Sequence, residues 1–367
     1  MKRIIAPVIT LLLVAGVGFA LYLSISERAV IDIKGLIGSE KEGYFRDPRV
    51  VAALNSAGLK VDFVKAGSRE IATNFDLKTY DFAFPAGIPA AEKIRRDRNI
   101  AKFYRAFFTP MTIASWKRVV QILEANKIAE QREGVYNVVD MQRLLELARQ
   151  KKRWNELPSS ESFPVGRSVL INSTDVRKSN SAAMYLSLAS YLYNGANVVT
   201  SDAQIAPIID DLVSLFSRQG FTGYSSETPF EDYVSQGPGK SPLVMIYESQ
   251  FLHARAQENS PISDDMVLLY PEPTVFTQHI LVPLSPAGER LGEALLSDPE
   301  LKRLAIEYGF RNDDRAGFTA FVKKHNLAVP PEIFNVVEVP SFEIIERMIA
   351  QIEDSYKGGP TNVPTNN

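Results

Sequence analysis

Short apolar runs alternate with helical patterns along the chain from about residue 30. In this first part, the pattern predicts strands and helices in the order 29–38, 47–58, 59–67, 69–75 and 80–87. The helix over 47–58 is well marked, because Pro48 stands in its first turn and Gly58 directly follows its last. Strand, helix and strand at this spacing predict a parallel sheet with right-handed crossovers. We therefore expect an α/β fold.

Two long extended runs interrupt the helical patterns farther along the chain. The first lies near 103–115 and the second near 267–282, where Pro271 and Pro273 restrict the backbone between two strand-like halves. Extended crossings of this kind predict two lobes joined by a two-strand hinge. The expected parts are lobe 1 over 29–108 and 275–315, lobe 2 over 109–274, a helical extension over 316–356 and a disordered tail over 357–367.

The amino terminus carries a membrane signal. Lys2 and Arg3 precede an uncharged, mostly apolar run over 4–25, which is long enough to span a hydrocarbon core. A cleaved signal peptide usually has a shorter apolar region, although 18–20 forms a weak cleavage site. We therefore expect 1–28 to be a retained, single-pass anchor. The positive-inside rule then places the body on the periplasmic or extracytoplasmic face of the inner membrane.

Composition excludes several kinds of chemistry. The formal net charge of -2, without Lys/Arg blocks among aromatic residues, argues against a nucleic-acid partner. The absence of cysteine excludes disulfides, thiolate catalysis and Cys-ligated zinc. His253, His279 and His325 lie far apart and are more typical of surface or packing positions than of a zinc site. No G-x-S-x-G or S-x-x-K motif occurs, and Val234 stands where a P-loop ending at Ser241 needs its first glycine.

Hydroxyl-rich turns follow three predicted strands. Gly-Ser pairs end the strands at 38–39 and 67–68, and the turn at 173–175 leads into a helix that opens on 179–181. Helix starts expose unpaired N–H groups and the positive end of the helix dipole, so they bind anions and other hydrogen-bond acceptors. Strand ends of a parallel sheet meet at one edge. Ordinary capping explains a single such turn, but three of them predict a binding site.

Two carboxylates leave a catalytic alternative open. Asp175 precedes the helix at 179, and Glu248 ends a strand that we expect to face the cleft, so an acid/base pair is conceivable. Asp175 could instead pair with Arg177, and Glu248 could orient Tyr247 or bind a cationic part of a ligand. Because no nucleophile or cofactor motif accompanies them, we expect no enzyme activity, no cofactor and no metal.

The order of several short motifs resembles that of bacterial extracellular solute-binding proteins of the type II periplasmic binding class. These motifs are GSEK (38–41), AGSRE (66–70), STDVRKSNSAAM (173–184), IYES (246–249), LYPEP (269–273) and LSDPELKRLAIEYGFR (296–311). The resemblance covers about residues 30–315 and is closest to membrane-anchored members. It implies two α/β lobes that clamp a ligand in the cleft between them. The chain departs from this class in lacking a lipobox cysteine and in its extra region 316–367.

The sequence thus predicts a solute-binding protein that holds a small polar or anionic ligand for an ABC-type permease or a sensor complex. A ligand-independent scaffold or sensor subunit of a membrane complex is the alternative. The expected ligand-binding residues are Ser39, Lys41, Ser68, Ser173, Thr174, Asp175, Arg177, Ser179, Asn180, Ser181, Tyr247, Glu248 and Tyr270.

Overall fold

The computed structural model describes residues 30–220, 222–333 and 335–357. The expected membrane anchor over 1–28 and nearly all of the expected tail lie outside these residues. Among the described residues, no helix combines the length and the apolar character that a membrane crossing requires.

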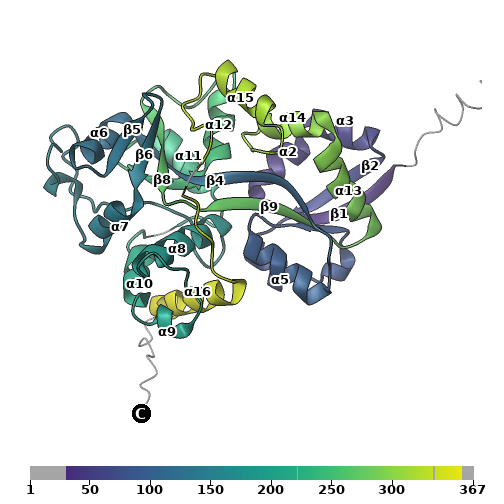
Figure 1. The fold of residues 1–367 in the computed structure, drawn as a ribbon, viewed down its shortest axis with the longest axis horizontal. Coiled ribbons are helices and arrows are strands. Elements are labelled where there is room, and N and C mark those ends of the chain that lie inside the picture. The colour runs from purple at the N-terminus through teal and green to yellow at the C-terminus, as the bar shows by residue number, and fades with distance from the viewer. Residues whose placement is uncertain (1–29, 221, 334, 358–367) are drawn as a thin grey trace, which may run out of the picture.

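A mixed sheet of nine strands runs through the described part of the molecule (Figure 1). Its order is β2-β1-β3-β9-β4-β8-β6-β5, with β7 paired to β4. The strands are β1 (Ile31–Ile37), β2 (Leu59–Lys65), β3 (Phe82–Phe84), β4 (Tyr104–Trp116), β5 (Ala129–Arg132), β6 (Tyr136–Asp140), β7 (Val244–Tyr247), β8 (Met266–Glu272) and β9 (Phe276–Pro283). As expected from the strand–helix–strand spacing, β1 is parallel to both β2 and β3.

The two expected crossings form β4 and the successive strands β8 and β9. Strand β4 pairs with β9 in antiparallel fashion from Tyr104 to Pro110, and then with β7 and β8 from Met111 onward. Figure 1 shows β4 and β9 running side by side between the two halves of the molecule. These two strands are therefore the main-chain connection that passes through the middle of the sheet.

Helices cover both faces of the sheet. Those built on the β1–β3 part are α2 (Glu42–Arg46), α3 (Pro48–Ser56), α4 (Ser68–Thr73), α5 (Ile88–Arg98), α13 (Pro286–Ser297) and α14 (Pro299–Glu307). The others are α6 (Lys117–Ala125), α7 (Met141–Arg149), α8 (Asn180–Tyr193), α9 (Asp202–Ile205), α10 (Ile209–Ser217), α11 (Glu227–Gln236), α12 (Glu248–Ala256), α15 (Arg315–Lys324) and α16 (Phe342–Tyr356). Short 3-10 turns are η1 (Ser39–Lys41), η2 (Leu77–Thr79) and η3 (Trp154–Glu156).

The buried apolar side chains fall into separate clusters, and the boundary between these clusters crosses β4. Two clusters cover the two faces of the β1–β3 part, one around Phe107 and the other around Ile280. A third, larger cluster begins at Met111 and includes Trp154. We use lobe 1 for the elements around the first two clusters and lobe 2 for those around the third. The expected domain boundaries stay a prediction.

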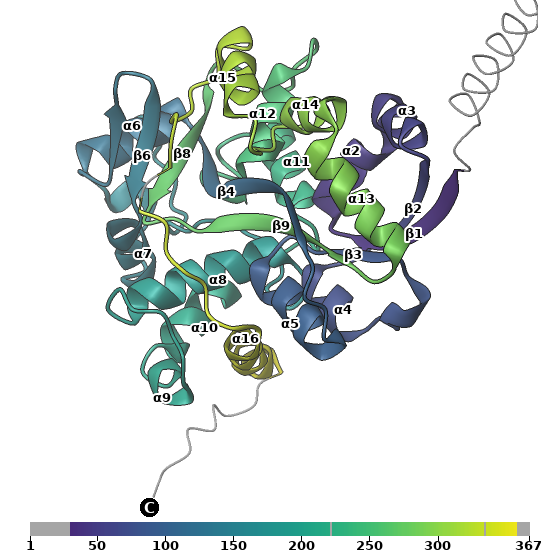
Figure 2. The ribbon, with the colours of Figure 1, turned by 45° about the vertical axis from the view of Figure 1, so that its right-hand side comes forward.

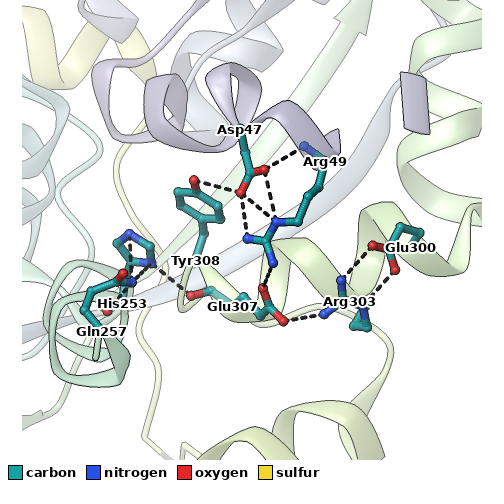
Figure 3. Close-up of polar contacts among 8 residues, drawn as sticks. All are labelled: Asp47, Arg49, His253, Gln257, Glu300, Arg303, Glu307 and Tyr308. Atoms are coloured by element: carbon teal, nitrogen blue, oxygen red, sulfur yellow. Dashed lines mark hydrogen bonds and ion pairs between the residues drawn. The ribbon is translucent and has the colours of Figure 1, made fainter. Parts of the chain in front are cut away.

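A polar network joins α14 to α3 and α12 (Figure 3). Asp47 caps α3 by accepting a hydrogen bond from the Arg49 amide at 2.8 Å, and Arg49 Nη1 contacts Glu307 Oε2 at 2.7 Å. On the lobe 2 side, the ring of His253 stacks on Tyr308, with 4.3 Å between ring centroids. His253 Nδ1 also lies 2.9 Å from the Glu307 carbonyl oxygen. This histidine therefore packs at the contact between the lobes.

The last helix, α16, contacts both lobes. Figure 2 shows it beside α10, and it also contacts α8, α9 and the lobe 1 helix α5. Its apolar face joins the large buried cluster of lobe 2, so the expected extension packs into that core. On its polar face, Glu346 accepts two hydrogen bonds from Arg69 Nε of α4 at 2.6 and 2.7 Å, and Glu343 pairs with Arg96 of α5. The helix therefore bridges the lobes.

Candidate functional site

A cleft of about 430 Å³ lies where the two lobes meet. Lobe 1 contributes 38–40, 65–68 and Glu70, while lobe 2 contributes 178–180, 224–227 and Tyr247. Hollows of about 480 and 720 Å³ also occur, but lobe 2 and the segment that follows α15 supply their lining residues. We take the cleft as the candidate site, because it draws on both lobes and on the strand ends that the sequence singles out.

Helix starts from both lobes surround this cleft. Strand β1 leads into η1 at Ser39, and β2 leads into α4 at Ser68. From lobe 2 come the starts of α8 after Ser179, of α11 after Ser226 and of α12 after Tyr247. The side chains of Ser179 and Ser226 make no cap hydrogen bond to their own helices. The first amides of α8 therefore retain hydrogen-bonding capacity toward a ligand, whereas the Glu227 and Thr228 amides that begin α11 already donate to Ser225.

Direct contacts cross the cleft and hold its walls together. Ser39 Oγ lies 3.1 Å from Ser225 Oγ, and Asn180 Nδ2 donates to the Ala86 carbonyl at 3.3 Å. At Gly67, an added Cβ atom would lie 2.4 Å from the carbonyl oxygen of Lys178, so only glycine fits this approach. The lobes are thus in contact around the cleft, which is the closed arrangement of a two-lobed molecule.

Five of the predicted ligand-binding residues line the cleft. They are Ser39, Ser68, Ser179, Asn180 and Tyr247. The hydroxyl of Ser68 accepts a hydrogen bond from the Ala86 amide at 2.8 Å, and the hydroxyl of Tyr247 accepts one from Asn180 Nδ2 at 3.1 Å. These two hydroxyl oxygens therefore help to set the shape of the cleft wall.

The predicted residues of the turn before α8 brace that turn and do not line the cleft. Ser173 Oγ contacts Gln219 Oε1 at 2.9 Å, and the buried Ser181 Oγ lies 2.8 Å from Thr174 Oγ1. Asp175 Oδ2 pairs with Arg177 Nη2 at 2.6 Å. This ion pair is the alternative that the sequence left open to a catalytic role for Asp175. Burial opposes the charge of Asp175, but the hydrogen bonds from Arg177 hold the pKa of the carboxyl below its usual value.

Glu248 and Tyr270 lie in the interior of the molecule. Glu248 does not end a strand facing the cleft, because it is the first residue of α12 and its side chain is fully buried. Arg311, which the sequence analysis did not single out, contacts its two carboxylate oxygens at 2.7 and 2.8 Å. The Tyr270 hydroxyl donates to Glu248 Oε1 at 2.7 Å. The carboxylate is therefore satisfied within the protein.

Lys41 is buried directly behind the cleft wall. Its ammonium pairs with Glu40 and lies 3.0 Å from His279 Nδ1 on the crossing strand β9. Burial raises the pKa of Glu40, but the charges and hydrogen bonds of Lys41 and His279 together outweigh burial and hold that pKa well below its usual value. Burial, reinforced by Lys41, lowers the pKa of His279 to about 4. Lys41 thus neutralises Glu40, which does line the cleft.

Acidification is expected to destabilise the protein through His279. Its pKa is about 4 in the folded state against an ordinary 6.5, so the unfolded chain binds more protons between these values. The stabilisation is complete above pH 6.5 and is lost as the pH falls toward 4, by up to about 3 kcal/mol. Urea unfolding at pH 7 and pH 4.5 measures this loss, and His279→Gln should make it smaller. An equal loss in the variant would assign the effect to other groups, such as Glu40, whose Oε1 lies 3.3 Å from His279 Nδ1.

Several lining residues are absent from the sequence-based prediction. The acidic and basic ones are Glu40, Lys65, Glu70, Lys178 and Glu227, and the loop before α11 adds Tyr224, Ser225 and Ser226. Glu40 and Glu70 belong to the motifs GSEK and AGSRE, so their position in the sequence could have identified them as cleft residues. The loop at 224–226 carries no such signal, because its place in the cleft depends on how lobe 2 packs against lobe 1.

Comparison with known proteins finds a similarity in structure alone. No family model and no curated protein matches the sequence. The periplasmic binding protein AfuA of Actinobacillus pleuropneumoniae, with fructose-6-phosphate bound, has a TM-score of 0.56 and 11% identity, over 89% of this chain and 99% of that one.

Two further structures are similar to the same extent. An ABC transporter solute-binding protein of Thermotoga lettingae, with α-D-tagatose bound, has a TM-score of 0.54 and 12% identity, over 89% of this chain and 94% of that one. The sulfate-binding protein SubI of Mycobacterium tuberculosis has a TM-score of 0.51 and 16% identity, over 82% of this chain and 93% of that one. The chain therefore has the mixed α/β fold of periplasmic solute-binding proteins.

Proposed function

We propose that this protein is an extracytoplasmic solute-binding protein that clamps a small polar or anionic ligand between its lobes. The observation that carries the proposal is the convergence of helix starts from both lobes on one cleft. The fold supports it, since the similar structures include a sulfate-binding protein and proteins that hold fructose-6-phosphate or tagatose. The cleft volume also falls in the range of small-molecule sites.

Ligand binding would act by stabilising the closed arrangement. A ligand that contacts both walls of the cleft binds the closed form more tightly than an open one, and this difference shifts the population toward closure. The hydrogen bond between Ser39 and Ser225 joins the two walls and would be lost on opening. Strands β4 and β9 would absorb the movement, because they connect the lobes through the sheet. Residues 1–28 would enter the membrane and keep the protein beside its partner. This partner, an ABC-type permease or a sensor, would recognise the closed form.

One observation favours the alternative of a ligand-independent scaffold. The ion pairs from α16 to Arg69 and Arg96 join lobe 2 to lobe 1 and need no ligand. A protein that these contacts keep closed would present a constant surface to its membrane partner. The two functions differ in a measurable way, because only the solute-binding protein gains stability from a small molecule.

A thermal-shift screen of the purified full chain separates the two functions. At about one hundred times its dissociation constant, a ligand stabilises the folded form by about 2.7 kcal/mol, which raises the melting temperature by several degrees. Sulfate, phosphate, sugars, sugar phosphates and amino acids are suitable probes. Ser39→Trp should abolish any shift by filling the cleft, while Val51→Trp, at an exposed site on α3, should preserve it. If no probe shifts the melting temperature, the scaffold function is favoured.

A further inference from the structure

The charged residues of the cleft are already paired, and this limits what the cleft can bind. Both lining lysines contact carboxylates: Lys65 pairs with Glu42, and Lys178 Nζ lies 3.4 Å from Glu70 Oε1. Glu40 pairs with the buried Lys41 behind it. Glu227 has no ion-pair partner among the described residues, so the two lining lysines face three lining glutamates.

The resulting field disfavours an anion. Two positive and three negative side chains leave the lining with a formal charge of -1, and adding the partners Lys41 and Glu42 does not change it. Partial burial, with Glu42, Glu231 and Glu40 nearby, raises the pKa of Glu227 above its ordinary value even though Lys65 opposes the shift. A free oxyanion would have to enter this negative field without an unpaired cation to receive it.

The hydrogen-bonding groups of the cleft are of both kinds. The first amides of α8 only donate, and the carboxylates of Glu70 and Glu227 only accept. Serine hydroxyls at 39, 179, 225 and 226 do both. An oxyanion can only accept and an ammonium ion can only donate, so either would leave part of this lining unsatisfied. A hydroxyl group of a ligand both donates and accepts, so it can bond to an amide, a carboxylate or another hydroxyl.

We infer that the ligand is an uncharged, polyhydroxylated molecule of the size of a simple sugar. This inference rests on the proposed function and narrows its ligand class. Tyr224, whose side chain lines the cleft and is 65% exposed, offers an aromatic surface for the C–H face of such a molecule. A zwitterion such as an amino acid is less suited, because its carboxylate would find both lining lysines engaged.

Matched probes test the ligand class with the purified full chain. We expect at least one of D-glucose, D-galactose, D-ribose and mannitol to raise the melting temperature, while sodium sulfate, sodium phosphate, glutamate and spermidine at equal ionic strength do not. The dissociation constant of the active sugar should change less than about twofold between 0.01 and 1 M salt, since screening affects only charged ligands. A shift caused only by a charged probe would overturn the ligand class and leave the proposed function standing. The absence of any shift would count against both.

A double substitution tests the reason for the selectivity. Glu70→Gln with Glu227→Gln releases Lys178 and changes the formal charge of the lining from -1 to +1. Sulfate should then stabilise the variant and bind at least about tenfold more tightly than to the unaltered protein. Glu231→Gln with Asp232→Asn is the matched control, because it changes the net charge equally on α11 outside the lining. If sulfate bound the unaltered protein as tightly as it binds the double variant, the inference would be overturned.

Discussion

Ending the chain after Val339, before α16, is expected to prevent lobe 2 from folding. The helix buries five large apolar side chains in the core of that lobe, each at most 6% exposed: Ile344, Ile345, Met348, Ile349 and Ile352. Each contributes about 1.5–3 kcal/mol, so their sum rivals the whole stability of a typical folded protein, about 5–15 kcal/mol. The truncated chain should accumulate in insoluble form or show no cooperative urea transition by circular dichroism.

A surface substitution on the same helix is the control for this truncation. Glu343→Gln removes the exposed ion pair with Arg96 and keeps the apolar face, so its cost should stay below about 1 kcal/mol. A truncated chain that unfolds cooperatively at the urea concentration of the full chain would show that α16 is dispensable for the core. The helix would then lie outside the cooperative core of lobe 2.

Replacing Arg311 with alanine is expected to cost about 3–5 kcal/mol of stability, because it leaves the fully buried carboxylate of Glu248 without its cation. Tyr270 alone would then hydrogen-bond that carboxylate. Urea unfolding measures the loss, and Arg46→Ala, which breaks a surface pair with Glu42, should cost less than about 1 kcal/mol.

The same variant tests the role that the sequence assigned to Glu248. If its carboxylate bound the ligand, Arg311→Ala would change ligand affinity in the molecules that remain folded. We expect the affinity to stay constant, because neither residue lines the cleft. Calorimetric titration at a temperature where the variant is still folded gives this affinity. A tenfold change in ligand affinity would show that Glu248 contributes to ligand binding.

The sequence predicts the fold well where the signals are local. Pro48 and Gly58 delimit α3 to within two residues, and the apolar runs give β1, β2 and the crossing strand β4. The general rule that ligands bind beyond the carboxyl ends of strands then places Ser39 and Ser68 beside the cleft. These conclusions depend only on neighbouring residues and on strand direction.

Other site residues were misplaced because their surroundings come from distant parts of the chain. Glu248 is held by Arg311, 63 positions away, and Lys41 contacts His279, 238 positions away. A polar residue after a strand looks the same in the sequence whether it faces a cleft or a buried partner. For Ser181 the spacing itself misled, because the second residue of α8 turns inward to Thr174 while Ser179 lines the cleft.

The pairing of early and late strands has a consequence for biosynthesis. Strand β3 lies between the early strand β1 and the late strand β9, where Phe82 pairs with Pro283, and α16, which begins at Phe342, completes the core of lobe 2. A ribosome must therefore translate more than eight-tenths of the 367 codons before lobe 1 has its last helix, α14, and more than nine-tenths before lobe 2 has α16. Contacts so distant in sequence slow folding and leave nascent chains incomplete. If the protein is exported as we propose, this delay would keep the chain unfolded while it is threaded through a translocation channel.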